Sequence, residues 1–278
     1  MPTAQLSDRA ALAIDGPDAE HFLQNIVTTD LDTLGAGEAK PGALLTPQGK
    51  ILFDFLISRR GEGGFLLDCR ADGADDLSRR LAMYKLRAKV QISKQDQPFV
   101  LARWQDDSAG SQTDSSPSET DSGWLVDARF PAEARVRRAY GVEAAANAAA
   151  EDWTRLRIAH GIAEGGSDYA PGDAFPHDVL LDLAGGVGFK KGCYVGQEVV
   201  SRMQHRGTAR RRAMIARGET ALPEAGTEVQ ANGRAIGTLG SVLGHDGLAI
   251  MRIDRVRDAL DAGHAITANG VPLTLSIP

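Results

Sequence analysis

Apolar residues near the start of the chain switch between helical and strand-like spacing. In GPDAEHFLQNIV (16–27), Phe22, Leu23 and their apolar neighbours recur at helical spacing behind a proline and two acidic residues, which predicts a half-buried helix. The apolar segments at 43–45 and 51–58 flank TPQG, whose proline and glycine predict a hairpin.

The residues after this hairpin predict one more helix and one more strand. GEGG at 61–64 is a turn signal that leads into the apolar segment FLLDC. Asp72 is typical of the cap of a helix, whose apolar face carries Leu77, Leu81 and Tyr84 before the short strand KVQI. Hairpin, helix and strand together predict an α+β unit.

The pattern of apolar and polar residues changes in the middle of the chain and again near its end. Residues 106–123 contain no large apolar side chain and predict a mobile surface loop. EDWTRLRIAHGI (151–162) again has helical spacing, with Gly161 as its expected C-terminal residue. After Gly207, short strands separated by Asn-Gly turns at Asn232 and Asn269 predict a small antiparallel barrel or sandwich.

Composition narrows the class of protein. The 278 residues are 42% hydrophobic and 24% charged, as in folded soluble proteins, and suffice for more than one domain. The net charge of -6 argues against binding nucleic acid over the whole surface. No apolar run reaches the roughly 18 residues of a membrane span, and the start resembles neither a secretory signal nor a transit peptide, so we expect a cytoplasmic protein.

The stretch KKGCYVGQEVVSRMQHRG (190–207) places Cys193 among residues suited to chemistry. A helix from about Gly196 to Gln204 would put the thiol just before a helix N-terminus and beside two lysines, which favours a thiolate. The alternative is a structural thiol, because free cysteines are usually buried and inert. Two cysteines are too few for the four ligands of an iron–sulfur cluster, so we predict no resident metal site.

The segment KGCYVGQEVVSRMQHRG resembles the signature of the YgfZ folate-binding protein family, which is related to the glycine-cleavage T-protein (aminomethyltransferase). The resemblance continues through residues 22–30, 44–57, 175–182 and 185–194 and covers nearly the whole chain except the serine-rich loop. It implies two interleaved ferredoxin-like α+β subdomains in residues 1–207, a β-barrel in 208–278 and a central cavity that binds tetrahydrofolate or a one-carbon derivative.

The resemblance also implies a role and a set of site residues. The role is the assembly, maturation or repair of iron–sulfur proteins, including tRNA-modifying enzymes, with such client proteins or assembly factors as partners. Cys193 is the expected catalytic thiol, while the choice between one-carbon and thiol chemistry stays open. The expected cofactor-binding residues are Asp54, Asp178, Lys191, Tyr194, Gln197, Glu198, Arg202 and Arg206.

Two carboxylates in this set have alternative interpretations. Alternation along 51–58 puts Asp54 on the face opposite Phe53 and Phe55, where it faces either a pterin or solvent. Asp178 stands where the family more often has glutamate, so its shorter side chain puts direct contact in doubt and favours a bridging water. Asp182 is interpreted as a turn or cap residue.

Two other functions compete with the accessory role. One is a true aminomethyltransferase, against which the cysteine in KGCY counts. The other is an RNA-binding module that makes a weak contact through the basic run 202–212, which lacks the aromatic residues of stacking platforms. Cys69, at the end of an apolar strand, is predicted to serve packing.

Overall fold

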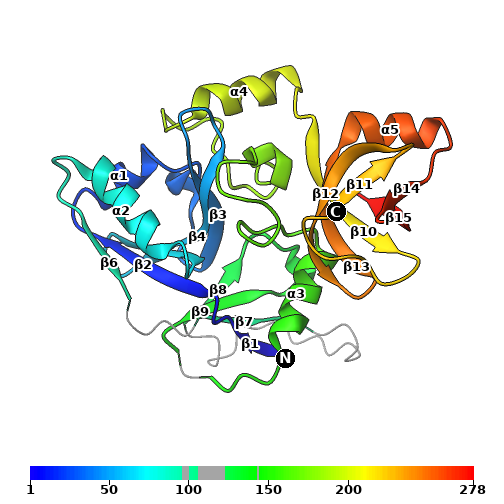
Figure 1. Cartoon of the computed structure of the whole chain (residues 1–278). Helices are drawn as coiled ribbons and strands as arrows, with labels where there is room; N and C mark the ends of the chain where they lie inside the picture. Colours follow the sequence, from blue (N-terminus) through cyan, green and yellow to red (C-terminus); the bar gives the residue numbers. More distant parts are fainter. Residues whose placement is uncertain (96–99, 106–122, 143) are drawn as a thin grey trace.

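A computed structural model describes residues 1–95, 100–105, 123–142 and 144–278. These residues form a nine-stranded sheet and, beside it, a closed six-stranded barrel (Figure 1). The order of strands in the sheet is β1 (Thr3–Gln5), β7 (Val100–Arg103), β9 (Arg137–Tyr140), β8 (Trp124–Asp127), β3 (Glu38–Leu45), β4 (Ile51–Arg60), β5 (Gly64–Arg70), β2 (Arg9–Asp15) and β6 (Gln91–Lys94).

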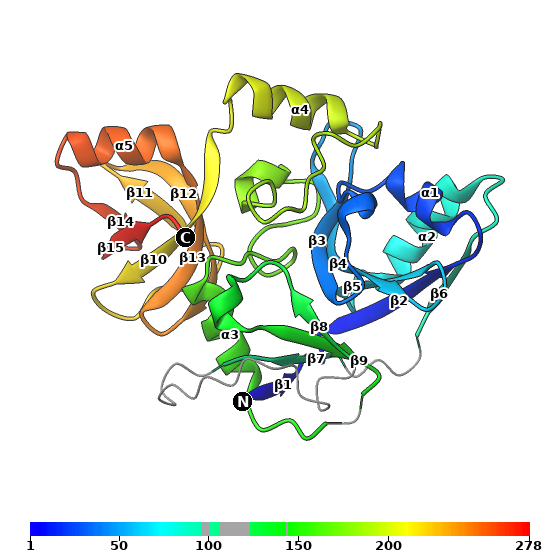
Figure 2. The same ribbon diagram turned by 180° about the vertical axis from the view of Figure 1, so that it is seen from behind.

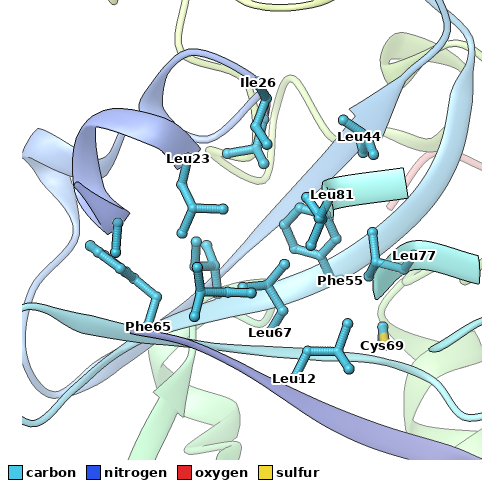
Figure 3. Packing of buried hydrophobic residues seen from close by; sticks show 14 of the residues in the cluster. Leu12, Leu23, Ile26, Leu44, Phe55, Phe65, Leu67, Cys69, Leu77 and Leu81 are labelled. Carbon is cyan, nitrogen blue, oxygen red and sulfur yellow. The ribbon is translucent and has the colours of Figure 1, made fainter. Parts of the chain in front are cut away.

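Two helices cover one face of the β3-to-β6 half of the sheet. Helices α1 (Ala19–Gln24) and α2 (Ala74–Lys85) pack their apolar residues against this face (Figure 3). The core side chains shown there include Leu12, Leu23, Phe55, Phe65, Leu67, Cys69, Leu77 and Leu81. The two predicted helices, the hairpin around TPQG, the turn at 61–64 and the packing role of Cys69 are therefore confirmed.

The other half of the sheet is assembled from segments that are distant in sequence. Strand β1 pairs with β7, whereas β2, only four residues further on, pairs with β5 and β6. Helix α3 (Ala150–Ala159) packs its Trp153 in a second cluster with residues of β1 and β7. A short parallel pairing of β3 with β8 joins the two halves. The expected interleaved α+β architecture is thus confirmed.

The barrel follows as one continuous piece of chain. Its order is β10 (Arg211–Gly218), β13 (Asp246–Arg252), β12 (Arg234–Leu243), β11 (Glu228–Ala231), β14 (Ile266–Ala268) and β15 (Val271–Ser276). Asn232 and Asn269 have positive φ angles of 48° and 46° at the β11–β12 and β14–β15 turns, as the Asn-Gly signals predict. Helix α5 (Ile253–Asp261), which the sequence analysis missed, buries Val256 and Ala259 against the barrel.

Some local predictions need correction. Asp72 does not cap α2, because the N-cap is Gly73. The Asp72 carboxylate instead accepts hydrogen bonds from Arg70. Alternation along 51–58 predicts that Ile51 shares a face with Phe53 and Phe55. A register shift in the β3–β4 pairing instead places Ile51 in a different apolar cluster. The loop predicted at 106–123 lies, apart from Gly123, outside the described residues.

The segment between sheet and barrel carries the cysteine motif. It contains the 3₁₀ helix η4 (Pro176–Val179) and helix α4 (Gln197–Arg206), which runs from the end of β3 towards the barrel (Figures 1 and 2). Two further 3₁₀ turns are η1 (Leu31–Thr33) and η3 (Ala132–Ala134). Among the described residues, none of the helices has the length and hydropathy to cross a membrane.

Candidate functional site

A cavity of about 700 Å³ lies beside β4, and we call it the β4 cavity. Its walls come from β4, the end of β5, one face of α2 and the loop before η4. Apolar side chains include Leu52, Phe53, Met83 and Tyr169, while the polar ones are Asp54, Arg70, Asp72, Asp76, Arg79 and Arg80. This volume is in the range of sites that enclose a small organic ligand.

Asp54 reaches this cavity because of its place in the strand. Phe55 and Ile57 point into the helix-covered core, so Asp54 and Leu56 point to the opposite face of the sheet. The Oδ2 atom of Asp54 accepts a hydrogen bond from the backbone N–H of Gly165 at 3.2 Å. Burial, only partly offset by Arg9, raises the pKa of the Asp54 carboxyl above its usual value. An added donor would therefore stabilise its charged form.

The close approach of Asp54 depends on Gly165. A Cβ atom at this position would collide with Oδ1 of Asp54. The neighbouring Gly166 has a φ of +83°, and a side chain there would also meet the guanidinium of Arg70. The pair Gly165–Gly166 thus lets the backbone of this loop form the wall of the cavity.

A second cavity, of about 190 Å³, borders the first at Asp54 and Tyr169. Arg9 and Arg129 also line it. Burial, reinforced by the nearby Asp54 and Asp168 carboxylates, raises the pKa of the Tyr169 hydroxyl well above its usual value, so the phenol stays protonated. Asp54 and this neutral phenol therefore border both cavities.

Behind these cavities lies a buried ionic network of four arginines and four acidic residues. Its ion pairs are Arg9–Asp68 (2.6 Å), Arg138–Asp68 (3.3 Å), Arg138–Asp127 (3.1 Å), Arg129–Asp127 (2.8 Å), Arg129–Glu164 (2.8 Å), Arg157–Glu164 (3.5 Å) and Arg157–Asp168 (3.1 Å). Burial alone would raise the pKa of Glu164, but Arg157 and the other arginines hold it well below the usual value. Through its ion pairs to Glu164 and Asp168, the network holds the 164–168 loop in place.

The network also reaches the barrel. The Nη2 atom of Arg157 donates to the hydroxyl of Ser241 on β12 at 3.0 Å, and Asp168 accepts from the Ser241 backbone N–H at 2.7 Å. The loop that walls the β4 cavity is therefore joined to the sheet on one side and to the barrel on the other.

Cys193 is exposed, on the loop just before α4. Its neighbours fix the loop: Lys191 is buried and donates to the carbonyls of Val27 and Thr29 at 2.8 and 2.6 Å. Burial lowers the pKa of Lys191 to about 8, against the opposing effect of Asp30 and Asp32. Tyr194 packs into an apolar cluster, and burial raises its pKa to about 12. An exposed thiol thus sits on a rigidly anchored loop.

The start of α4 is held against the β3–β4 turn. Gly196 is the N-cap, with a φ of +79°, and a side chain there would meet the backbone of Thr46 and Gly49. The helix N-terminus therefore follows Cys193, as the sequence predicts. The first helical residue is Gln197, one residue later than the expected start at Gly196.

The α4 residues expected to bind a cofactor lie away from the β4 cavity. Gln197 is half-buried, Glu198 and Arg202 are exposed and paired with each other, and Arg206 is exposed in the last turn. Lys191, Tyr194 and these four are not among the residues that line either cavity beside Asp54. The structure therefore brings only Asp54 of the expected set to that space.

Asp178 and Asp182 hold η4 and the start of the barrel together. Asp178 is buried, accepts from the Phe175 N–H at 3.0 Å and lies 3.4 Å from Nε of Arg211. Burial raises its pKa, although the Phe175 hydrogen bond and Arg211 oppose this. Asp182 lies in the turn that follows η4, as predicted, although it is not a cap; it accepts from both terminal nitrogens of Arg212, at 2.6 and 3.0 Å. Neither carboxylate lines the two cavities beside Asp54.

Comparison with known proteins identifies the family. The chain is 31% identical to the mouse mitochondrial iron-sulfur cluster assembly factor IBA57, over 92% of this chain and 79% of the mouse protein. The chain belongs to the IBA57 family. The human factor is 29% identical over 99% of this chain, and the Chaetomium globosum homologue is 33% identical over 76% of this chain, though only 55% of its own length is covered.

Domain matches agree with this membership. Residues 4–102 match the GCVT N-terminal domain, and residues 210–278 match the C-terminal β-barrel domain of CAF17. In three dimensions, the chain resembles the glycine cleavage system aminomethyltransferase T from Bartonella henselae, with a TM-score of 0.69, 19% identity and coverage of 91% of this chain and 78% of that one. This likeness shows the T-protein fold. The narrower YgfZ assignment stays a prediction.

The expected cytoplasmic location is wrong by this comparison. The IBA57 relatives from mouse, human and Chaetomium globosum are all named mitochondrial. The expectation relied on features that the first residues lack, and such an absence does not determine a compartment.

Several residues of the site escaped the sequence analysis. The glycine pair 165–166 and Tyr169 build the cavity wall, and EGG before a Ser-Asp-Tyr run was the available signal. The buried arginines had no comparable signal, because arginines and acids in strands are normally solvent-exposed. Within the described residues, no group of three or more histidine, cysteine or acidic side chains is placed to hold a metal ion.

Proposed function

We propose that the chain binds tetrahydrofolate, or a one-carbon derivative, in the β4 cavity and acts in the maturation of iron–sulfur proteins. The observation that carries the binding proposal is Asp54, a half-buried carboxylate with a raised pKa at the wall of a cavity of suitable volume. The names of the IBA57 relatives support the maturation role.

The residues present suit a folate. The N–H groups of a pterin edge would donate to Asp54 and compensate for its burial, which the Gly165 hydrogen bond and the charge of Arg9 offset only in part. Phe53, Met83 and Tyr169 offer apolar contact for the rings. When bound, tetrahydrofolate supplies a carrier for one-carbon units; the chain itself binds, orients and shields the pterin.

Cys193 is the proposed functional thiol. It is exposed, it lies outside the lining of the β4 cavity, and Lys191 and Tyr194 anchor its loop. This arrangement favours contact with another protein, and we propose iron–sulfur assembly factors or client proteins, tRNA-modifying enzymes among them, as partners. The alternative functions have less support: the IBA57 relatives are not named aminomethyltransferases, and Arg202, Arg211 and Arg212 already pair with carboxylates.

Calorimetric titration with tetrahydrofolate under reducing conditions tests the binding proposal. We expect saturable binding and a rise in melting temperature, because a ligand that binds only the folded state stabilises it by mass action; at a hundredfold excess over Kd the gain is about 2.7 kcal/mol. Absence of both heat and thermal stabilisation at millimolar folate would reject this proposal.

Substituting Cys193→Ser tests the thiol separately. Because the side chain is exposed and of similar size, we expect unchanged melting temperature and folate affinity. A hydroxyl is a far weaker nucleophile and soft-metal ligand than a thiolate, so iron–sulfur enzyme activities in cells that depend on this variant should be mostly lost. Cys69→Ala, which leaves Cys193 as the remaining thiol, is the control and should keep those activities. Full support by Cys193→Ser would assign the cysteine to structure alone.

A further inference from the structure

We propose that the mouth of the β4 cavity binds the tail of a folate that carries several glutamates, through an arginine pair on α2. This inference rests on the proposed folate function and names the form of folate that the site would select. It concerns Arg79 and Arg80, which the sequence analysis did not assign to any role.

Helix α2 has two faces with different tasks. Ala74, Leu77 and Leu81 are buried against the sheet. Asp76, Arg79, Arg80 and Met83 follow each other at helical spacing on another face and line the cavity. Since Arg79 and Met83 are exposed, whereas Asp54 is half-buried and also borders the second cavity, α2 forms the mouth and Asp54 the inner end.

Two of the three arginines at the mouth of the cavity form ion pairs, and the third forms none with the described residues. Arg79 pairs with Asp76 at 2.7 Å, and Arg70 pairs with Asp72 at 2.8 Å. Arg80 is half-buried and has no ion-pair or hydrogen-bond partner within the described ranges of the chain. Met83 is 65% exposed and lies one turn from Arg79. The mouth therefore offers an apolar surface next to an uncompensated cation.

A ligand that matches the cavity donates hydrogen bonds to Asp54 at the inner end and carries carboxylates that reach the arginines at the mouth. Folates have this order: a pterin, an aromatic ring and then glutamate. Each additional glutamate adds a carboxylate beyond the ring, where Arg80 and Arg79 can pair with it. Because these arginines are partly solvated, each pair should tighten binding by no more than about fivefold.

The test compares tetrahydrofolate with one and with three glutamates, by calorimetric Kd measurement at low and high salt. For the unsubstituted protein we expect the triglutamate to bind about fivefold more tightly, with the preference falling at about 0.5 M salt. In R79A/R80A the ratio of the two dissociation constants should fall to near one. Arg80→Lys should keep part of the preference because it keeps the charge.

Arg87→Ala is the matched control, because Arg87 is an exposed arginine just beyond α2 that does not line the cavity. It should retain the full preference. Equal affinity of the unsubstituted protein for both folates, or a preference that R79A/R80A leaves intact, would overturn this inference while the proposed folate function stands. Failure of both folates to bind would remove the function and the inference together.

Discussion

Replacing Asp68 with alanine is expected to lower the free energy of unfolding by about 3–5 kcal/mol. Asp68 is fully buried and accepts from Arg9 at 2.6 Å, from Arg138 at 3.3 Å and from the hydroxyl of Tyr140 at 3.1 Å. Its removal leaves two buried guanidinium groups without that counter-charge, and the cost of a buried unpaired charge exceeds the gain from any single surface interaction. Urea denaturation with a fitted m-value measures the change.

Asp75→Ala is the matched control for this measurement. Asp75 also pairs with a cation, Lys94, at 2.8 Å, but its side chain is 74% exposed. Because solvent screens such an exposed pair, its loss should lower the free energy of unfolding far less than the Asp68 substitution does. If Asp68→Ala were as mild as Asp75→Ala, the buried network would not contribute to stability in the way its geometry indicates.

The second large effect is expected at Asp54. Asp54→Asn keeps the size of the side chain but removes the charge that would accept hydrogen bonds from a pterin. Charge-assisted hydrogen bonds contribute about 1.5–3 kcal/mol, so tetrahydrofolate affinity should fall by about one to two powers of ten. The raised pKa of Asp54 also implies that the change from carboxylate to amide costs the unliganded protein little stability. Calorimetry and thermal melting report the two quantities.

Asp178→Asn distinguishes the structure from the sequence-based assignment. The resemblance implies a folate contact for Asp178, whereas the side chain is committed to Phe175 and Arg211 outside the cavities beside Asp54. The folate affinity of Asp178→Asn should therefore stay within about twofold of the unsubstituted protein, a change smaller than one hydrogen bond. A loss at Asp178 with none at Asp54 would favour the assignment by resemblance and move the site away from β4.

Local pattern predicted the parts of the fold that depend on neighbours in sequence. The α2 face with Leu77 and Leu81, the hairpin around TPQG and the Asn232 and Asn269 turns follow from spacing and turn chemistry, and the structure confirms them. Helix α5 was missed because it follows β13 without a break: Arg252 ends the strand and Ile253 begins the helix. No turn signal separates them.

The site was predicted less completely because it is assembled by long-range contacts. Alternation placed Asp54 on the face opposite Phe55, but only the pairing of β4 with β5, and of β5 with β2, brings it near Arg9. Lys191 and Tyr194 were expected to contact a cofactor, yet the burial of both gives them an anchoring role in the structure. Their proximity to Cys193 in the sequence does not indicate which way their side chains point.

The placement of strand β1 has a consequence for how the chain folds during its synthesis. Residues 9–94 contain β2 to β6 and both helices of one core, so they can pack soon after they leave the ribosome. Strand β1 is made earlier, but its partner β7 ends at Arg103, and Asn147 accepts a further hydrogen bond from the backbone of Thr3. The first strand must therefore wait, unpaired, for about a hundred residues or more of further synthesis, several seconds at typical elongation rates. Because an unpaired strand is prone to aggregation, the nascent chain carries this risk until β7 has emerged.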